Sequence, residues 1–83
     1  MLKGSGAIKL NLVDDGTTKT MAYDGSGNLI YLGKARPGTL KSESGWQIQK
    51  FTYSGSNITD VQFAGGKDTF NNIWDSRAGY SYS

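Results

Sequence analysis

The sequence contains no cysteine and no histidine. The absence of cysteine excludes disulfides, thiolate metal sites and thiol nucleophiles, and it leaves the redox compartment undetermined, because reducing and oxidising environments both tolerate such a chain. The absence of histidine removes the commonest general base, proton shuttle and zinc ligand. Most of the usual routes to catalysis are therefore closed to this chain.

The sequence also lacks the glycine-rich motifs that bind nucleotides and the Gly-x-Ser-x-Gly motif that presents a serine nucleophile. Gly25-Ser26-Gly27 has no third glycine at the spacing of a dinucleotide fingerprint. Gly66-Lys67 is followed by Asp68, where a phosphate-binding loop needs Ser or Thr. We therefore expect a protein that is not an enzyme and that needs no cofactor and no metal.

Long apolar runs are missing as well. No run approaches the roughly 20 residues of a membrane span, and the first residues do not have the pattern of a signal peptide. Nine Lys or Arg stand against seven Asp or Glu, which gives a net charge of +2 spread along the chain. This balance produces no large single-sign field, so it points neither to a membrane surface nor to nucleic acid.

The chain has 83 residues, of which 36% are hydrophobic, and this is enough for one modest core. We therefore predict a single β domain over residues 1–83. A domain of this size without disulfides or metal is only marginally stable, and self-association is a common remedy. A homo-oligomer is accordingly expected.

Alternation of apolar and polar residues predicts short strands separated by glycine-rich turns. The expected strands cover residues 7–13, 18–23, 29–32, 46–53, 59–63 and 80–82. Within the fourth of these, the alternation changes phase after Ile48, which we interpret as a β-bulge near Gln49 or Lys50. A short helical turn is predicted near residues 69–76. The predicted fold class is all-β, a small antiparallel sandwich or barrel of about six to seven short strands.

The predicted core consists of the large apolar residues in phase with these strands and with the helical turn: Ile30, Trp46, Ile48, Phe51, Val61, Phe63, Ile73 and Trp74. Trp46 and Trp74 have an alternative role as exposed stacking platforms for sugars or bases. We favour core packing for both tryptophans, because each is in phase with other apolar residues.

Residues 33–45 form the longest segment without a strand pattern, and they contain the only proline. Pro37-Gly38 predicts a type II turn, since proline presets φ at the second turn position and glycine tolerates positive φ at the third. Loops commonly carry recognition residues on a rigid scaffold. The candidate contact residues on this loop are Lys34, Arg36, Pro37 and Lys41.

Several segments together resemble a group of small proteins encoded in tailed-bacteriophage genomes. The resemblance covers residues 21–83, and its most distinctive part is the spacing from Pro37-Gly38-Thr39 to Trp46 combined with the ending Trp74-Asp75-Ser76-Arg77. The other matching segments are Tyr23–Ala35, Trp46–Ile48, Phe51–Asn57, Phe70–Ala78 and Tyr80–Ser83. Residues 1–20 fit the pattern poorly.

The resemblance implies a virion structural module, either a capsid decoration protein or a neck- or tail-associated protein, that is made in the host cytoplasm and located in the virion. Its partners would be other virion proteins or further copies of itself, joined through a protein–protein assembly surface. The alternative function is a carbohydrate-binding β module on a phage or bacterial surface protein, using an exposed tryptophan or a row of tyrosines. A small β-barrel that binds single-stranded nucleic acid ranks last.

Overall fold

The computed structural model describes residues 15–83, and the strand expected at 7–13 lies outside the described residues. The described residues form an antiparallel sheet of five strands and one short 3-10 helix. In chain order the elements are β1 (Thr18–Tyr23), β2 (Leu29–Ala35), β3 (Ser44–Ser54), β4 (Asn57–Phe63), β5 (Asn72–Ile73) and η1 (Trp74–Gly79). The prediction of an all-β antiparallel domain is confirmed.

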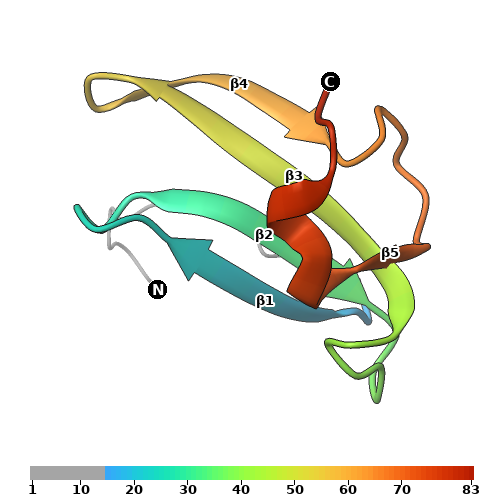
Figure 1. The fold of residues 1–83 in the computed structure, drawn as a ribbon. Coiled ribbons are helices and arrows are strands. Elements are labelled where there is room, and N and C mark those ends of the chain that lie inside the picture. The colour runs from blue at the N-terminus through green and yellow to red at the C-terminus, as the bar shows by residue number, and fades with distance from the viewer. Residues whose placement is uncertain (1–14) are drawn as a thin grey trace.

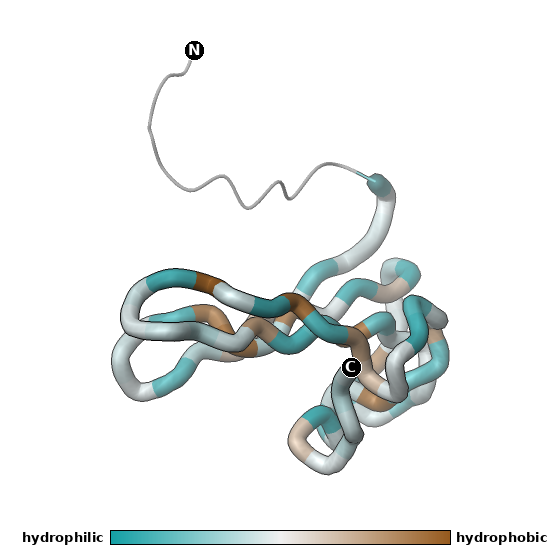
Figure 2. The backbone as a smooth tube through the Cα atoms, turned by 90° about the horizontal axis from the view of Figure 1, so that it is seen from above, coloured by the Kyte–Doolittle hydropathy of each residue, from teal (hydrophilic) through white to brown (hydrophobic). Residues whose placement is uncertain are grey.

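β3 is the longest strand and organises the sheet, which has the order β1-β2-β3-β4 (Figure 1). β2 pairs with its central part, β4 with its C-terminal part, and β5 with its N-terminal part. The turns of the β1–β2 and β3–β4 hairpins therefore lie at one end of the sheet, and the loop between β2 and β3 lies at the other (Figures 1 and 2).

The turn between β1 and β2 is held by the carboxylate of Asp24. Its Oδ1 atom accepts hydrogen bonds from the backbone N–H of Ser26 at 2.8 Å and of Asn28 at 2.9 Å. These bonds stabilise the ionised carboxylate, with the Asn28 N–H contributing most, and they lower the pKa of Asp24 below its usual value.

The core lies on one face of the sheet, which we call the inner face, beneath η1. Trp46, Ile48 and Trp74 are almost fully buried, as predicted, with Ala35 and Ala64 beside them. Gly33 allows the close approach of η1, because a Cβ atom at this position would lie 2.6 Å from Cε3 of Trp74. Packing on the inner face therefore depends on a glycine in the middle of β2.

Other parts of the predicted core are less buried. Ile30, Phe51, Phe63 and Ile73 are half-buried. Val61 was wrongly placed in the core: its exposure is 46%, because it lies on strand β4 at the edge of the sheet and on the face opposite η1. The sequence-based core also omitted four buried residues, Leu29, Leu32, Ala35 and Ala64.

The helical turn begins later than predicted. It was expected near residues 69–76 but covers Trp74–Gly79, because the two residues before it form β5. The Asn72 side chain donates to the Trp46 carbonyl at 3.1 Å, and the backbone N–H of Ile73 donates to the Tyr80 hydroxyl at 2.8 Å. These bonds hold residues 72–73 in an extended conformation against β3.

The C-terminal residues are tied into the sheet, as the alternation at Tyr80 and Tyr82 indicated. Tyr82 forms an antiparallel bridge with Ala64, and the backbone N–H of Phe63 donates to the carbonyl of Ser83 at 3.1 Å. This segment pairs with the end of β4 on the side away from β3. It also brings the Tyr82 ring over the inner face, where the ring packs against the core.

Candidate functional site

The face of the sheet opposite η1, which we call the outer face, is also largely apolar. Cross-strand pairing sets its side chains in rows, because residues directly opposite each other on neighbouring strands project from the same face. The register places Met21, Leu32, Gln49 and Phe63 in one row. Phe51 and Val61 form the next row toward the hairpin turns, and Tyr23 lies beside Met21 with its hydroxyl 3.8 Å from the Met21 sulfur.

No helix or strand within residues 15–83 lies over the outer face (Figure 1). The exposed fractions of two of its side chains are 56% for Tyr23 and 46% for Val61. Leu32, on a central strand, is nevertheless buried. The described domain therefore exposes a contiguous apolar surface, a feature that typically marks an interaction site.

The phase change in β3 explains why this surface was missed from the sequence. The predicted bulge near Gln49 or Lys50 is absent, since the pairing of these two residues with both β2 and β4 is regular. The register shifts instead fall between Ser44 and Trp46 and between Thr52 and Tyr53. The apolar residues change from the inner face to the outer face after Ile48, so this strand carries apolar side chains on both faces.

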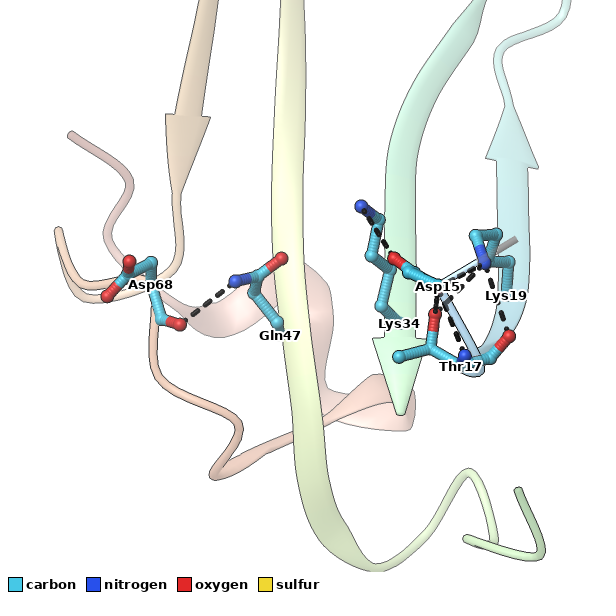
Figure 3. A network of polar contacts seen from close by, with 6 residues as sticks. All are labelled: Asp15, Thr17, Lys19, Lys34, Gln47 and Asp68. Atoms are coloured by element: carbon cyan, nitrogen blue, oxygen red, sulfur yellow. Dashed lines mark hydrogen bonds and ion pairs between the residues drawn. The ribbon is translucent and has the colours of Figure 1, made fainter. Parts of the chain in front are cut away.

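A polar row closes the end of the outer face away from the hairpin turns (Figure 3). It contains Lys19, Lys34 and Gln47, which the register places side by side on β1, β2 and β3. Asp15 contacts both lysines, with Oδ1 2.8 Å from the Lys19 Nζ and Oδ2 3.7 Å from the Lys34 Nζ. At the other end of the row, the Gln47 amide donates to the carbonyl oxygen of Asp68 at 2.9 Å.

The contacts of Asp15 favour its ionised form. The hydrogen bond from Lys19 lowers the pKa of this carboxyl most, followed by the bonds from the hydroxyl and the backbone N–H of Thr17, and the pKa falls far below its usual value. Two lysines thus share one carboxylate, so this end of the outer face carries an excess of positive charge. The Asp68 side chain makes no ion pair within residues 15–83.

The predicted contact loop is shorter than expected. Strand β2 continues to Ala35 and β3 begins at Ser44, so the loop covers residues 36–43 rather than 33–45. The type II turn is confirmed: Gly38 has a φ of 94°, and the Thr39 N–H donates to the Arg36 carbonyl at 3.2 Å. The Trp46 indole N–H also donates to the Leu40 carbonyl at 3.0 Å, which anchors the loop to the core.

The structure separates the four candidate contact residues. Arg36 and Pro37 line an open hollow with a volume of about 540 Å³, together with the exposed ring of Phe70. Lys34 projects instead from β2 onto the outer face, where it meets Asp15. Lys41 is exposed, and its backbone carbonyl accepts a hydrogen bond from the Asp75 N–H at 3.1 Å. The four residues therefore do not form one basic cluster.

The aromatic residues of the inner face form a closed cluster around Arg77. The guanidinium carbon lies 4.6 Å from the ring centre of Trp74 and 5.7 Å from that of Tyr31. The Tyr82 hydroxyl donates to the Arg77 carbonyl at 2.7 Å, and burial raises the pKa of Tyr82 to about 12. With exposures of 1% for Trp46 and 4% for Trp74, neither indole offers a stacking platform.

Within residues 15–83, no group of three or more acidic side chains is placed to hold a metal ion. No helix in the same part of the chain is long and apolar enough to cross a membrane. Comparison of the chain with family models, curated proteins and solved structures gives no match.

Proposed function

We propose that this chain is a structural module of a tailed-bacteriophage virion, acting through a protein–protein assembly surface as a capsid decoration protein or as a neck- or tail-associated protein. The observation that carries the assembly role is the uncovered apolar outer face. The assignment to a virion rests on the resemblance of residues 21–83 to small proteins encoded in phage genomes.

The geometry of the outer face suits an assembly role better than a catalytic one. Its side chains are carried by hydrogen-bonded strands, so their backbone positions are already fixed and binding does not have to order a loop. Its centre is apolar or uncharged, and its charges are confined to one end, which is the usual arrangement of a dry interface core with a polar rim. Many weak contacts of this kind add up when copies are arranged on a symmetric particle.

The virion assignment is tested on particles of the phage that encodes the chain, purified by density gradient and analysed by mass spectrometry. We expect the chain in the particle fraction at a copy number comparable to that of a symmetric shell, ring or tube. A chain recovered only from the soluble fraction of the lysate would exclude the virion role.

Two matched variants test which surface attaches the chain to particles. Val61→Lys places a charge on the outer face, whereas Leu40→Lys makes the same kind of change at a side chain on the loop whose exposure is 62%. We expect Val61→Lys to abolish attachment and Leu40→Lys to preserve it. If double replacement of Arg36 and Lys41 by Ala releases the chain while Val61→Lys does not, the loop is the attachment surface instead.

The carbohydrate alternative has less support, because both tryptophans are buried. Tyr23 is the one exposed aromatic residue on the outer face within the described chain. A glycan array is the direct check of this alternative, and binding that is lost on Tyr23→Ala would favour it over assembly.

A further inference from the structure

We propose that the partner of the outer face is a second copy of this chain, packed sheet against sheet about a two-fold axis that runs parallel to the strands between β2 and β3. The inference rests on the proposed assembly role and specifies its partner. Two sheets packed face to face keep their strands within about 30° of each other and lie about 10 Å apart, so the dimer would be a two-layer sandwich.

The apolar side chains of the outer face are complementary under this axis. The rotation places β1 of one copy over β4 of the other, and β2 over β3. Met21 then lies over Phe63 of the second copy, and Tyr23 lies over Val61 of the second copy. Leu32 lies over Gln49 of the second copy. Two exposed apolar side chains of the face, Tyr23 and Val61, thus cover each other.

The polar row is complementary under the same axis. Across one copy it runs from Lys19 on β1 through Lys34 and Gln47 to Asp68 (Figure 3). The two-fold rotation reverses this order, so Lys19 lies over Asp68 of the second copy and Lys34 lies over Gln47 of the second copy. Because the operation is symmetric, each dimer contains two such pairings of a lysine with Asp68.

An arrangement with the axis perpendicular to the strands is disfavoured. It would place the polar end of one copy over the apolar hairpin end of the other, so the excess positive charge of two lysines that share Asp15 would lie against apolar side chains. Removing an uncompensated charge from water in this way is costly. The charge pattern therefore selects one of the two simple face-to-face arrangements.

The area of the outer face determines the expected affinity of the dimer. Four strands about 4.8 Å apart, with about five residues each at about 3.3 Å per residue, give a footprint of roughly 300–400 Å² per copy in projection. A standard interface buries about 800 Å² per partner. We therefore expect a weak dimer, with a Kd on the order of 100 μM, which local concentration on a particle would strengthen.

Sedimentation equilibrium of the full chain, from roughly 10 μM to about 1 mM, tests the proposal. We expect a reversible monomer–dimer equilibrium that weakens at least roughly tenfold on Val61→Lys. Asp68→Lys should weaken it, because two lysines would then face each other across the interface. Asp75→Lys makes the same charge change on η1, over the inner face, and should leave the dimer unchanged. Thermal melting confirms that each variant is folded.

A chain that is monomeric at every concentration overturns the proposal, as does a dimer that is insensitive to Val61→Lys. The proposal is also overturned if the unmodified chain is monomeric and Leu10→Lys makes it dimerise. This result would mean that residues of the same chain before Asp15 cover the outer face until the substitution displaces them. A dimer that is weakened by Val61→Lys but not by Asp68→Lys overturns the proposed axis. Monomeric chain found on phage particles would reject the dimer and leave the proposed function standing.

Discussion

Replacement of Gly33 by Ala tests the packing of η1 on the sheet. The new Cβ would lie 2.6 Å from Cε3 and 2.8 Å from Cζ3 of Trp74, and 3.2 Å from Cγ2 of Thr20. Real Cβ atoms do not approach carbon this closely, so Trp74 or β2 must shift. The φ of Gly33 lies outside the left-handed region, so the substitution introduces steric overlap without backbone strain.

Two opposing effects determine the magnitude. Overpacking of a core typically costs about 1–3 kcal/mol, and the overlap with a nearly fully buried indole favours the upper part of that range. Alanine in place of a strand glycine raises the free energy of unfolding by about 0.5–1 kcal/mol, mainly because it lowers the conformational entropy of the unfolded chain. We expect a net loss of about 1.5–2 kcal/mol, which corresponds to a Tm lower by roughly 6–16 °C for a domain of this size.

Urea unfolding followed by tryptophan fluorescence measures the loss in Gly33→Ala. Gly25→Ala is the matched control, because nothing lies within 4 Å of a Cβ at that position and its φ is outside the left-handed region. A double-mutant cycle with Trp74→Leu should show that Gly33→Ala is less harmful once the ring is removed. Equal stability of Gly33→Ala and the unmodified chain would refute the described contact between β2 and η1.

Three further changes probe the other interactions. Arg77→Ala should lower stability by about 1 kcal/mol through loss of its stacking on Trp74, whereas Arg36→Ala should have almost no effect. Equal urea midpoints for the two variants would contradict this. Tyr82 favours the folded state while its hydroxyl is protonated, so stability should fall as pH rises from 10.0 toward 12, with a smaller fall in Tyr82→Phe. Parallel pH–Tm curves would argue against this assignment. Asp24 has a lowered pKa in the folded state, so its contribution should be lost as pH falls below 3.8. Asp24→Asn should melt earlier at neutral pH and show a smaller acid-induced drop, and an unchanged acid profile would exclude that role.

The sequence predicted the elements governed by local signals. Alternation located β1 to β4 to within a few residues, and Pro37-Gly38 identified the turn between β2 and β3. The burial of Trp46 and Trp74 also followed from their phase with other apolar residues. These features depend on backbone preferences and on side-chain periodicity, both of which can be evaluated along the chain.

Features that depend on pairing between distant strands were less accessible. Val61 has the same alternation as a core residue, and it is exposed because it lies on the edge strand β4 and on the face opposite η1. The phase change in β3 was interpreted as a bulge because one apolar face was assumed, although the regular register shows two. The polar row likewise exists only because the register aligns Lys19, Lys34 and Gln47.

The distance in sequence between η1 and the strands that it contacts has a consequence for the order of folding. The β1–β2 and β3–β4 hairpins join neighbours in sequence, and isolated hairpins of this kind form in about 1–10 μs. Residues 72–79 must instead close a long loop before Trp74 can contact Gly33 and Trp46, and such non-local closure is slower. Backbone circular dichroism should therefore develop before the indole emission changes, and stopped-flow traces recorded with these two signals should separate in time.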